Sequence, residues 1–430
     1  MLIRFEVSNF RSILAPVELS MVAVDRDRPA ARPAAMLGEN LLTVAGIYGP
    51  NASGKSNVLA ALRWIQDAVG VSLLAWDDAI PVQPFAFGNN THQSTAFTVE
   101  LLIDEVRYEY VVELDTDSIN YEALFHYPEK KRRRIFERDG LKLVLQRGLG
   151  ELSGTRQLLT PRTLVLTAGR RFGVAVVSDF ANALLDMRSR GVAAAMQHVA
   201  VAAKRDGPTD SWFDVERSIE LERSFEPQRS VKALRMEYER HRSEALALLR
   251  LADLGIDGVL FDDEHTELPS GEVRTRRLPR LVHRTSADSA PLDFDAESAG
   301  TRNWYQLIGL LLDVLRSGSL LMLDEIDASL HPTLSAELLQ LFHDPATNPR
   351  GAQLIFTTHD TSLLNHLNRD EVWLTEKDPS GATRLGGLAE FAGERVRKSQ
   401  NLENAYLHGR FGALPDVDRG ELLRALGLIA

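Results

Sequence analysis

Apolar and polar positions alternate along the first part of the chain in patterns that predict short strands. Residues 2–8 (LIRFEVS) alternate as a strand with one face in water would. Residues 41–48 (LLTVAGIY) are almost entirely apolar, which predicts a buried strand that runs into a Gly-rich turn. Residues 96–114 predict a β-hairpin that turns near Asp104 and Glu105. Residues 130–138 (KKRRRIFER) and 141–147 (LKLVLQR) are expected to extend this meander.

The middle of the chain, from about 170 to 260, has a helical pattern instead. One helix is expected to end at Gly255 as its C-cap, and its apolar face is formed by Leu234, Tyr238, Ala245, Leu249 and Ala252. Residues 261–290 are charged and weakly periodic, so we expect a loop or a ragged hairpin there. Apolar strands return at 319–323 and 353–358 with helices between and after them, which predicts a mainly parallel sheet.

Composition excludes several kinds of chemical site and indicates where the protein works. The 430 residues carry a formal net charge of −11, which argues against a surface that binds polyanions all over but leaves a local basic groove open. The chain contains no cysteine, so disulfides, thiol catalysis and zinc–thiolate sites are excluded. The apolar runs are too short and too interrupted for a signal peptide or a membrane span. We therefore expect a cytoplasmic protein.

A phosphate-binding motif follows the buried strand at 41–48. The run GPNASGKS fits the pattern G-x-x-x-x-G-K-[ST], and a helix is expected from Lys55 to about Val69. Lys55 is predicted to reach the β- and γ-phosphates of ATP, and Ser56 to ligate Mg²⁺. Backbone amides of the loop and of the helix start would hold the phosphates. The predicted nucleotide-binding residues here are Gly49, Pro50, Asn51, Ala52, Ser53, Gly54, Lys55, Ser56 and Asn57.

A second motif is an apolar strand that ends in two carboxylates. Residues 320–323 (LLML) are followed by Asp324 and Glu325. A strand of this kind delivers Asp324 beside the phosphate-binding loop, where it can hold Mg²⁺ through water. Glu325 would then polarise the water that attacks ATP. Together the two motifs predict an enzyme that hydrolyses ATP with Mg²⁺ as its cofactor.

The run DEIDASLHP, which begins at Asp324, resembles the Walker B and D-loop segment of ABC-type ATPases. That resemblance implies that Asp327 lies at a dimer interface and that His359, in TTHD, is the switch histidine that contacts the γ-phosphate. It also implies that Ser298 and Gly300, in ESAGT before a helix, form the signature motif, which binds ATP held by the opposite subunit. By itself, Ser298 before a helix is equally typical of a plain N-cap.

Two further nucleotide-site residues are implied by the same resemblance. The segment VSNFRSI is similar to the opening strand of these ATPases, in which a basic residue, here Arg11, lies near the nucleotide. Gln83, in IPVQPFAF, is the candidate for the glutamine that reaches the metal, and Gln93 is its rival.

The whole chain resembles the ABC-type AAA-family ATPases of bacteria and archaea, which are related to the heads of RecF, structural-maintenance-of-chromosomes (SMC) proteins and overcoming-lysogenisation-defect nucleases. The expected fold is α/β, a P-loop NTPase with a mixed β lobe, a parallel-sheet lobe and a mainly helical insertion. Residues 1–165 and 286–430 would form the ATPase head, and residues 166–285 the insertion. The insertion has no long heptad run, so no extended coiled coil is expected.

What the resemblance implies about function is a homodimer switched by ATP. Members of this group often serve antiphage defence systems, including those of the PARIS, Septu and abortive-infection kinds, in which they control a partner nuclease or toxin. The alternative is a RecF/SMC-like ATPase of DNA repair or recombination that clamps DNA. Measured DNA affinity would separate the two.

Three charged clusters remain outside these motifs. Residues 262–267 (DDEHTE) have metal-binding side chains, but such a crowded stretch is more typical of a solvated loop. Residues 130–134 (KKRRR) form one basic run, and a second group comprises Arg274, Arg276, Arg277, Arg280, His283 and Arg284. Each basic cluster fits contact with DNA, contact with an acidic partner, or a solvated strand edge.

Overall fold

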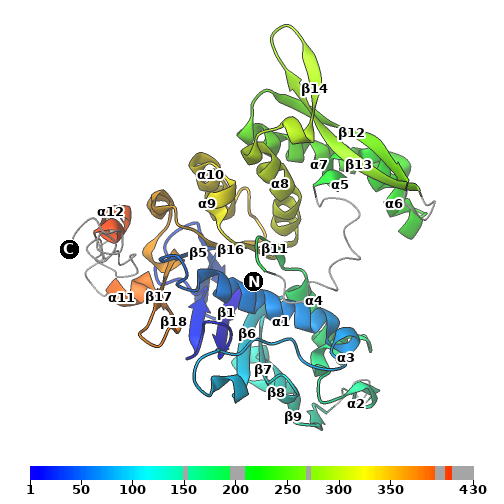
Figure 1. Cartoon of the computed structure of the whole chain (residues 1–430). Helices are drawn as coiled ribbons and strands as arrows, with labels where there is room; N and C mark the ends of the chain where they lie inside the picture. Colours follow the sequence, from blue (N-terminus) through cyan, green and yellow to red (C-terminus); the bar gives the residue numbers. More distant parts are fainter. Residues whose placement is uncertain (148, 150–153, 194–208, 268–272, 393–401, 409–430) are drawn as a thin grey trace.

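The computed structural model describes the chain except for residues 148, 150–153, 194–208, 268–272, 393–401 and 409–430. Two lobes form a head, and a third group of elements projects from it as an arm, at the upper right of Figure 1. The head is mixed α/β, with one antiparallel and one largely parallel sheet. The expected α/β class of the head is therefore confirmed.

The antiparallel lobe is a seven-stranded sheet in the order β10-β9-β8-β7-β6-β1-β2. Its strands are β1 (Leu2–Ser8), β2 (Val17–Ser20), β6 (Thr95–Ile103), β7 (Val106–Leu114), β8 (Ile119–His126), β9 (Arg133–Asp139) and β10 (Lys142–Leu145). The expected meander is confirmed for β6, β7, β9 and β10, and it contains one further strand, β8, that was not predicted. Asp104 and Glu105 both have positive φ, 47° and 63°, as a tight two-residue hairpin turn requires.

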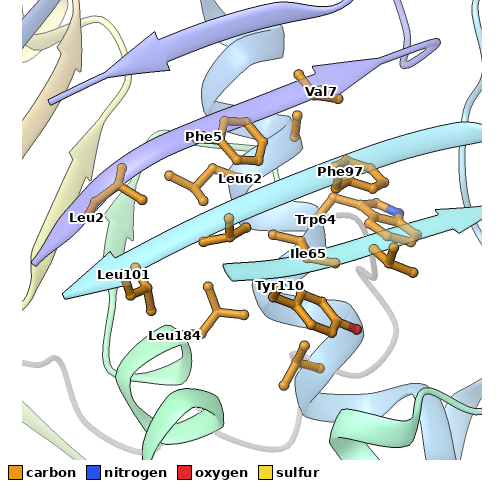
Figure 2. Packing of buried hydrophobic residues seen from close by; sticks show 14 of the residues in the cluster. Leu2, Phe5, Val7, Leu62, Trp64, Ile65, Phe97, Leu101, Tyr110 and Leu184 are labelled. Atoms are coloured by element: carbon orange, nitrogen blue, oxygen red, sulfur yellow. The ribbon is translucent and has the colours of Figure 1, made fainter. Parts of the chain in front are cut away.

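The longest helix of the head, α1 (Lys55–Ala75), runs past its expected end and fills the space beneath the antiparallel sheet. Trp64 stacks on Phe97 of β6 with ring centroids 4.9 Å apart, and Figure 2 shows it among apolar side chains of β1, β6 and α4. Among the described residues, α1 is the one helix long and apolar enough to cross a membrane. Its most apolar window is 61% buried within the protein, so its composition suits a core helix.

The parallel lobe is a six-stranded sheet in the order β11-β15-β16-β5-β17-β18. Its strands are β5 (Val44–Tyr48), β11 (Arg188–Arg190), β15 (Leu320–Leu323), β16 (Gln353–Thr357), β17 (Val372–Lys377) and β18 (Thr383–Gly387). All pairs are parallel except β17 with β18. Because parallel strands end at one edge of the sheet, the loops after β5, β15 and β16 meet there.

The expected single strand at 41–48 is wrong. Leu41 and Leu42 belong to β4 (Glu39–Leu42), which pairs with β3 (Ala31–Ala34) in a separate hairpin, and the parallel sheet begins only at Val44. Thr43 separates the two strands. Both strands are apolar at this point because both are buried, so periodicity alone does not mark the change of partner.

The segment after β10 stays with the head for longer than expected. It contains α2 (Thr155–Leu158), α3 (Val165–Arg170) and α4 (Ala175–Leu185), and the last two pack against α1. β11 then pairs with β15. The head therefore includes residues up to Arg190, whereas the insertion was expected to begin at 166.

The arm consists of three helices and a three-stranded sheet. These are α5 (Asp210–Phe213), α6 (Val215–Phe225), α7 (Val231–Ala252), β12 (Ile256–Glu267), β13 (Val273–Arg284) and β14 (Ser289–Asp293). The predicted apolar face of α7 is buried at Leu234, Ala245 and Leu249. The predicted cap at Gly255 is wrong, because the helix ends at Ala252 and the Asp253 side chain accepts the Gly255 amide.

The segment expected as a loop or ragged hairpin is a regular hairpin of two 12-residue strands, β12 and β13. Asp262 pairs with Arg280, and Asp263 with Arg277, each at 3.1 Å. These cross-strand ion pairs offset the charges for which the segment was expected to be a loop. Because of the hairpin, the inserted part is mixed α/β rather than mainly helical.

The remaining elements link the arm to the head and complete the head. They are α8 (Ala299–Ser317), α9 (Ile326–Ser329), α10 (Pro332–His343), α11 (Leu388–Ala392), α12 (Leu402–Leu407) and the 3₁₀ turns η1 (Asn90–His92), η2 (Pro128–Lys130), η5 (Phe294–Ala296), η6 (Thr361–His366) and η7 (Arg369–Glu371). In Figure 1, α8 lies between the arm and the lobes.

Candidate nucleotide-binding site

The phosphate-binding loop connects β5 to α1 at the carboxyl edge of the parallel sheet. Gly49 and Gly54 have φ of 150° and 105°, so a side chain at Gly54 would be strained. A Cβ on Gly54 would lie 2.0 Å from the Thr383 Oγ1 atom, and one on Gly49 would lie 2.4 Å from the Thr375 carbonyl oxygen. Only glycine fits these two positions, which leaves the backbone free to curve round an anion.

Hydroxyl groups from distant segments hold the loop from behind. Ser53 Oγ lies 2.6 Å from Thr375 Oγ1, and Thr383 Oγ1 donates to the Ser53 carbonyl at 2.8 Å. Asn57 Nδ2 donates to Ser12 Oγ at 2.6 Å. Sequence reasoning missed Ser12, Thr375 and Thr383, because nothing in their local pattern sets them apart from other hydroxyl residues.

Lys55 lies at the first position of α1 and is 5% exposed. Its Nζ donates to the carbonyl oxygens of Gly49 and Pro50 at 2.9 and 3.0 Å, so the ammonium group is held over its own loop. Burial lowers the pKa of Lys55 from its usual value. Three carboxylates oppose that shift: those of Asp327, Glu325 and Asp324. The loop thus has a positive charge at one side and negative charges at the other.

Two of the three predicted metal ligands, Ser56 and Asp324, meet at the end of β15. Ser56 Oγ donates to Asp324 Oδ1 at 3.0 Å, and Thr357 Oγ1 donates to the same oxygen at 2.5 Å. Thr357 Oγ1 also accepts the Glu325 amide at 2.8 Å, and Glu325 has a left-handed φ of 51° with an exposed side chain. A hydroxyl and a carboxylate are the oxygen ligands that Mg²⁺ prefers, so the donor set fits this ion with a nucleotide phosphate. Sequence reasoning gave Thr357 no role.

The D-loop and the candidate switch histidine form one hydrogen-bonded unit. Asp327 Oδ1 accepts from Thr358 Oγ1 at 2.6 Å and from the His359 amide at 3.1 Å. The His359 side chain is exposed. A shift of Asp327 would therefore move the backbone of His359, since both bonds end on the same carboxylate oxygen.

The candidate signature residues lie at the start of α8. Ser298 is the N-cap of α8, and its Oγ accepts the Thr301 amide at 3.0 Å. Its neighbour Glu297 bonds His283 of β13 at 2.7 Å. Within the described residues, no hydrogen bond joins Ser298 to the phosphate-binding loop of the same chain. In this chain alone Ser298 therefore acts as the cap that its sequence context allowed.

Arg11 and Gln83 contact one another. The Arg11 amide donates to the Gln83 carbonyl at 2.6 Å, and Arg11 Nε donates to Gln83 Oε1 at 2.9 Å. Burial lowers the pKa of Arg11. The next residue, Ser12, bonds Asn57, so this pair lies beside the start of α1. The rival, Gln93, accepts an Asn9 side-chain bond on its carbonyl instead. The metal role of Gln83 stays a prediction.

The remaining charged clusters are largely paired. Asp262 and Asp263 bond arginines of β13, and among the described residues no group of three or more metal-binding side chains forms a cluster. In the basic run, Arg132 pairs with Glu109 at 3.1 Å and Arg134 with Glu137 at 2.6 Å, while Lys130 and Lys131 are exposed. The side chains of Arg274 and Arg276 lie outside the described residues.

Comparison with solved structures gives matches to SMC heads. A head bound to the C-winged helix domain of ScpA is 13% identical, with 90% of this chain and 96% of that chain covered and a TM-score of 0.44. The head with an extended coiled coil from Pyrococcus furiosus, bound to the C-terminal domain of ScpA, is 13% identical, with 90% and 97% covered and a TM-score of 0.45. The head from Thermotoga maritima is 13% identical, with 90% and 98% covered and a TM-score of 0.39.

Comparison with curated proteins gives no significant match. A family model matches residues 44–156 and 200–365, which is more than half of the chain. Its description reads "AAA domain, putative AbiEii toxin, Type IV TA system". The matched ranges include the phosphate-binding loop, Asp324, Glu325 and His359. The chain therefore belongs to this AAA family, and its phosphate-binding loop between β5 and α1 is that of a P-loop NTPase.

Proposed function

We propose that the protein binds and hydrolyses ATP with Mg²⁺. The observation that carries this proposal is that the hydroxyl groups of Ser56 and Thr357 both donate to one carboxylate oxygen of Asp324, beside the phosphate-binding loop. Bound ATP would supply the phosphoanhydride bond that is hydrolysed, and Mg²⁺ would neutralise the negative charge that develops on the phosphate oxygens. Ser56 and Asp324 would hold the ion, and Gln83 is the candidate for a further ligand.

The other site residues would orient the reaction. Lys55 would leave its carbonyl partners for the β- and γ-phosphate oxygens, which attract an ammonium group more strongly than a neutral carbonyl does. Glu325, exposed at the end of β15, would accept a proton from the attacking water. His359 would donate to the γ-phosphate, and Arg11 would contribute positive charge at the loop.

The proposed working unit is a homodimer in which Ser298 and Gly300 of one subunit complete the site of the other. The helix start at α8 has amides that suit an anion, and Ser298 makes no bond to its own loop among the described residues. ATP would then bind the closed dimer better than the open one. To convert a mostly open dimer into a mostly closed one, ATP must favour closure by about 5.5 kcal/mol.

The proposed biological role is that of a sensor ATPase in a defence system, which controls a partner nuclease or toxin. Its support is the family description, which names a putative toxin of a type IV toxin–antitoxin system. A DNA-clamping repair ATPase is the competing role, supported by the exposed Lys130 and Lys131. Clamping predicts DNA binding that needs ATP and weakens with salt.

The decisive experiment is Glu325→Gln, with Glu337→Gln on an exposed part of α10 as the matched control. Loss of the general base should slow ATP hydrolysis by about 100-fold or more while leaving ATP binding intact. The variant should therefore accumulate as an ATP-bound dimer, measured by light scattering with Mg²⁺-ATP. A variant that hydrolyses ATP at the wild-type rate contradicts the role of Glu325, and one that stays monomeric contradicts the dimer.

A further inference from the structure

Arg190 joins two elements that the proposed ATP cycle must move together. It is the last residue of β11, the strand beside β15, and is paired in register with Leu323. Its carbonyl oxygen accepts the amide of Asp324 at 3.0 Å. The backbone of Arg190 is therefore fixed to the residue proposed to hold Mg²⁺.

The Arg190 side chain reaches in the other direction, to α8. Its Nη2 donates to Asn303 Oδ1 at 3.2 Å and to Gln306 Oε1 at 2.8 Å. Asn303 follows the candidate signature residue Ser298 by little more than one helical turn. Within the part of the chain that the structure describes, no carboxylate pairs with Arg190, and burial lowers its pKa. The guanidinium is thus committed to two neutral amide oxygens on the signature helix.

The neighbouring positions on α8 are held by the arm instead. Trp304 Nε1 donates to the Leu248 carbonyl of α7 at 2.6 Å, and Tyr305 OH donates to Asp210 of α5 at 2.9 Å. Thr209 bonds both the Tyr305 carbonyl and the Gly309 amide. The signature half of α8 is therefore anchored to the arm on one face and to the parallel sheet, through Arg190, on another.

The backbone that follows Arg190 packs closely against Asp324. Gly191 has φ of 75°, and a Cβ at this position would lie 2.9 Å from the Asp324 carbonyl oxygen. The chain thus turns directly against Asp324, with Glu325 next in sequence. A displacement of α8 that pulled Arg190 would act on these two residues over a very short path.

We propose that Arg190 is a positioning residue that couples the signature helix, with its arm, to Asp324 and Glu325. This inference rests on the proposed function. When Ser298 of one subunit engages the partner's ATP, α8 and the arm would move as one body, and Arg190 would carry that movement to the chain's own carboxylates. Engagement of one composite site would thereby set the geometry of the other, and a partner bound to the arm would act on hydrolysis by the same path.

The test compares Arg190→Ala with Arg190→Lys and with Arg188→Ala. Arg188 lies two residues earlier on the same strand, and its one described hydrogen bond goes to the Asp186 carbonyl. It faces Asp313 of α8 by charge alone, so it controls for the loss of a cation beside α8. Arg190→Ala should bind ATP within about twofold of wild type, and with Glu325→Gln added it should still form the ATP-bound dimer. Its kcat should fall by about 10- to 100-fold, as expected for a misplaced catalytic group. Lys should restore part of the rate, and Arg188→Ala should behave as wild type.

Two outcomes would overturn the proposal: an Arg190→Ala kcat equal to that of Arg188→Ala, or a loss of ATP binding that accounts for the whole defect. If Arg190→Ala does not fold, the double variant Asn303→Ala and Gln306→Ala removes the same contacts from the other side and should give the same kinetic pattern. A wild-type protein that neither hydrolyses ATP nor dimerises would instead refute the proposed function, so the two failures are distinguishable.

Discussion

Individual side chains at the site are held by partners that ATP would have to replace or keep. Lys55 bonds two carbonyl oxygens of its own loop, while Ser56 and Thr357 share Asp324. The first set is suited to exchange, because a phosphate oxygen is a stronger acceptor than a carbonyl. The second set fixes the carboxylate that is proposed to hold the metal.

At Lys55, replacement by alanine should lower the affinity for Mg²⁺-ATP by at least about 10- to 100-fold, because a charge-assisted bond contributes roughly 1.5–3 kcal/mol. Titration calorimetry measures this directly. Lys142→Ala, at the exposed first position of β10, is the control and should bind normally. Retained affinity in Lys55→Ala would refute the assigned role of the lysine.

Gly54→Ala tests whether the loop depends on its glycine. The variant combines a left-handed φ with a Cβ only 2.0 Å from Thr383 Oγ1, so nucleotide binding should be lost. Gly140→Ala is matched to it, since Gly140 also has positive φ (54°) but open space around it. That control should cost about 1–3 kcal/mol of stability and leave binding unchanged. If both variants bind nucleotide equally well, the predicted clash between a Cβ at position 54 and Thr383 is contradicted.

Residue chemistry explains which site residues the sequence could predict. The loop from Gly49 to Ser56 and the pair Asp324–Glu325 are contiguous, so their pattern is visible in a single line of sequence. Thr383 supports Ser53 from 330 positions away, and threonine is too common for its role to be read locally. The sequence also did not predict that Arg11 and Gln83 contact each other, although each was a separate candidate for the site.

Among the elements, α8 has two functions that meet at its N-cap, Ser298. Ser298 caps the helix, and the same helix start is the proposed contact for the partner's ATP. Ser298→Arg should leave ATP binding by the monomer within about twofold, yet reduce dimer-dependent ATPase activity by about tenfold or more, because a bulky cation would replace the hydroxyl. Ser298→Thr retains the cap and should be close to wild type. Unchanged activity in Ser298→Arg would exclude a contact across subunits.

Element prediction succeeded where one physical signal dominated and failed where two competed. The β6–β7 hairpin followed from alternation and a turn, and both were correct. The β12–β13 hairpin was not predicted as regular strands, because its many charges resemble a loop until cross-strand pairs such as Asp262 with Arg280 are known. The change of sheet at Thr43 leaves no trace in a run of buried residues.

Across the whole molecule, buried ion pairs tie distant segments of the head together. Glu371 is almost fully buried, where it contacts Arg28 from near the N-terminus and His343 from α10. Burial alone would raise the pKa of Glu371, but the nearby His343 and the charge of Arg28 outweigh it, so the pKa is lowered. Since the folded pKa lies below the unfolded one, this carboxylate stabilises the fold above the ordinary value of 4.5, and that contribution is lost as the pH falls below it.

Glu371→Gln should therefore lower the free energy of unfolding at pH 7 by about 1–3 kcal/mol, and the difference from wild type should shrink toward pH 4. Thermal unfolding across this pH range measures both effects. Glu376→Gln, at the exposed end of β17, provides the control and should match wild type throughout. A Glu371→Gln deficit that is constant with pH would show that the ion pair does not cause it.

The threonines behind the phosphate-binding loop also bear on how the protein is made. Ser53 is synthesised early, but its partners Thr375 and Thr383 follow more than 300 residues later. At roughly 5–20 residues per second, the ribosome takes on the order of 15 seconds or more to supply them. Until then the loop has no support from β17 and β18. A growing chain would thus lack a supported phosphate-binding loop, and in the proposed dimer the order of synthesis would keep unfinished heads from pairing through ATP.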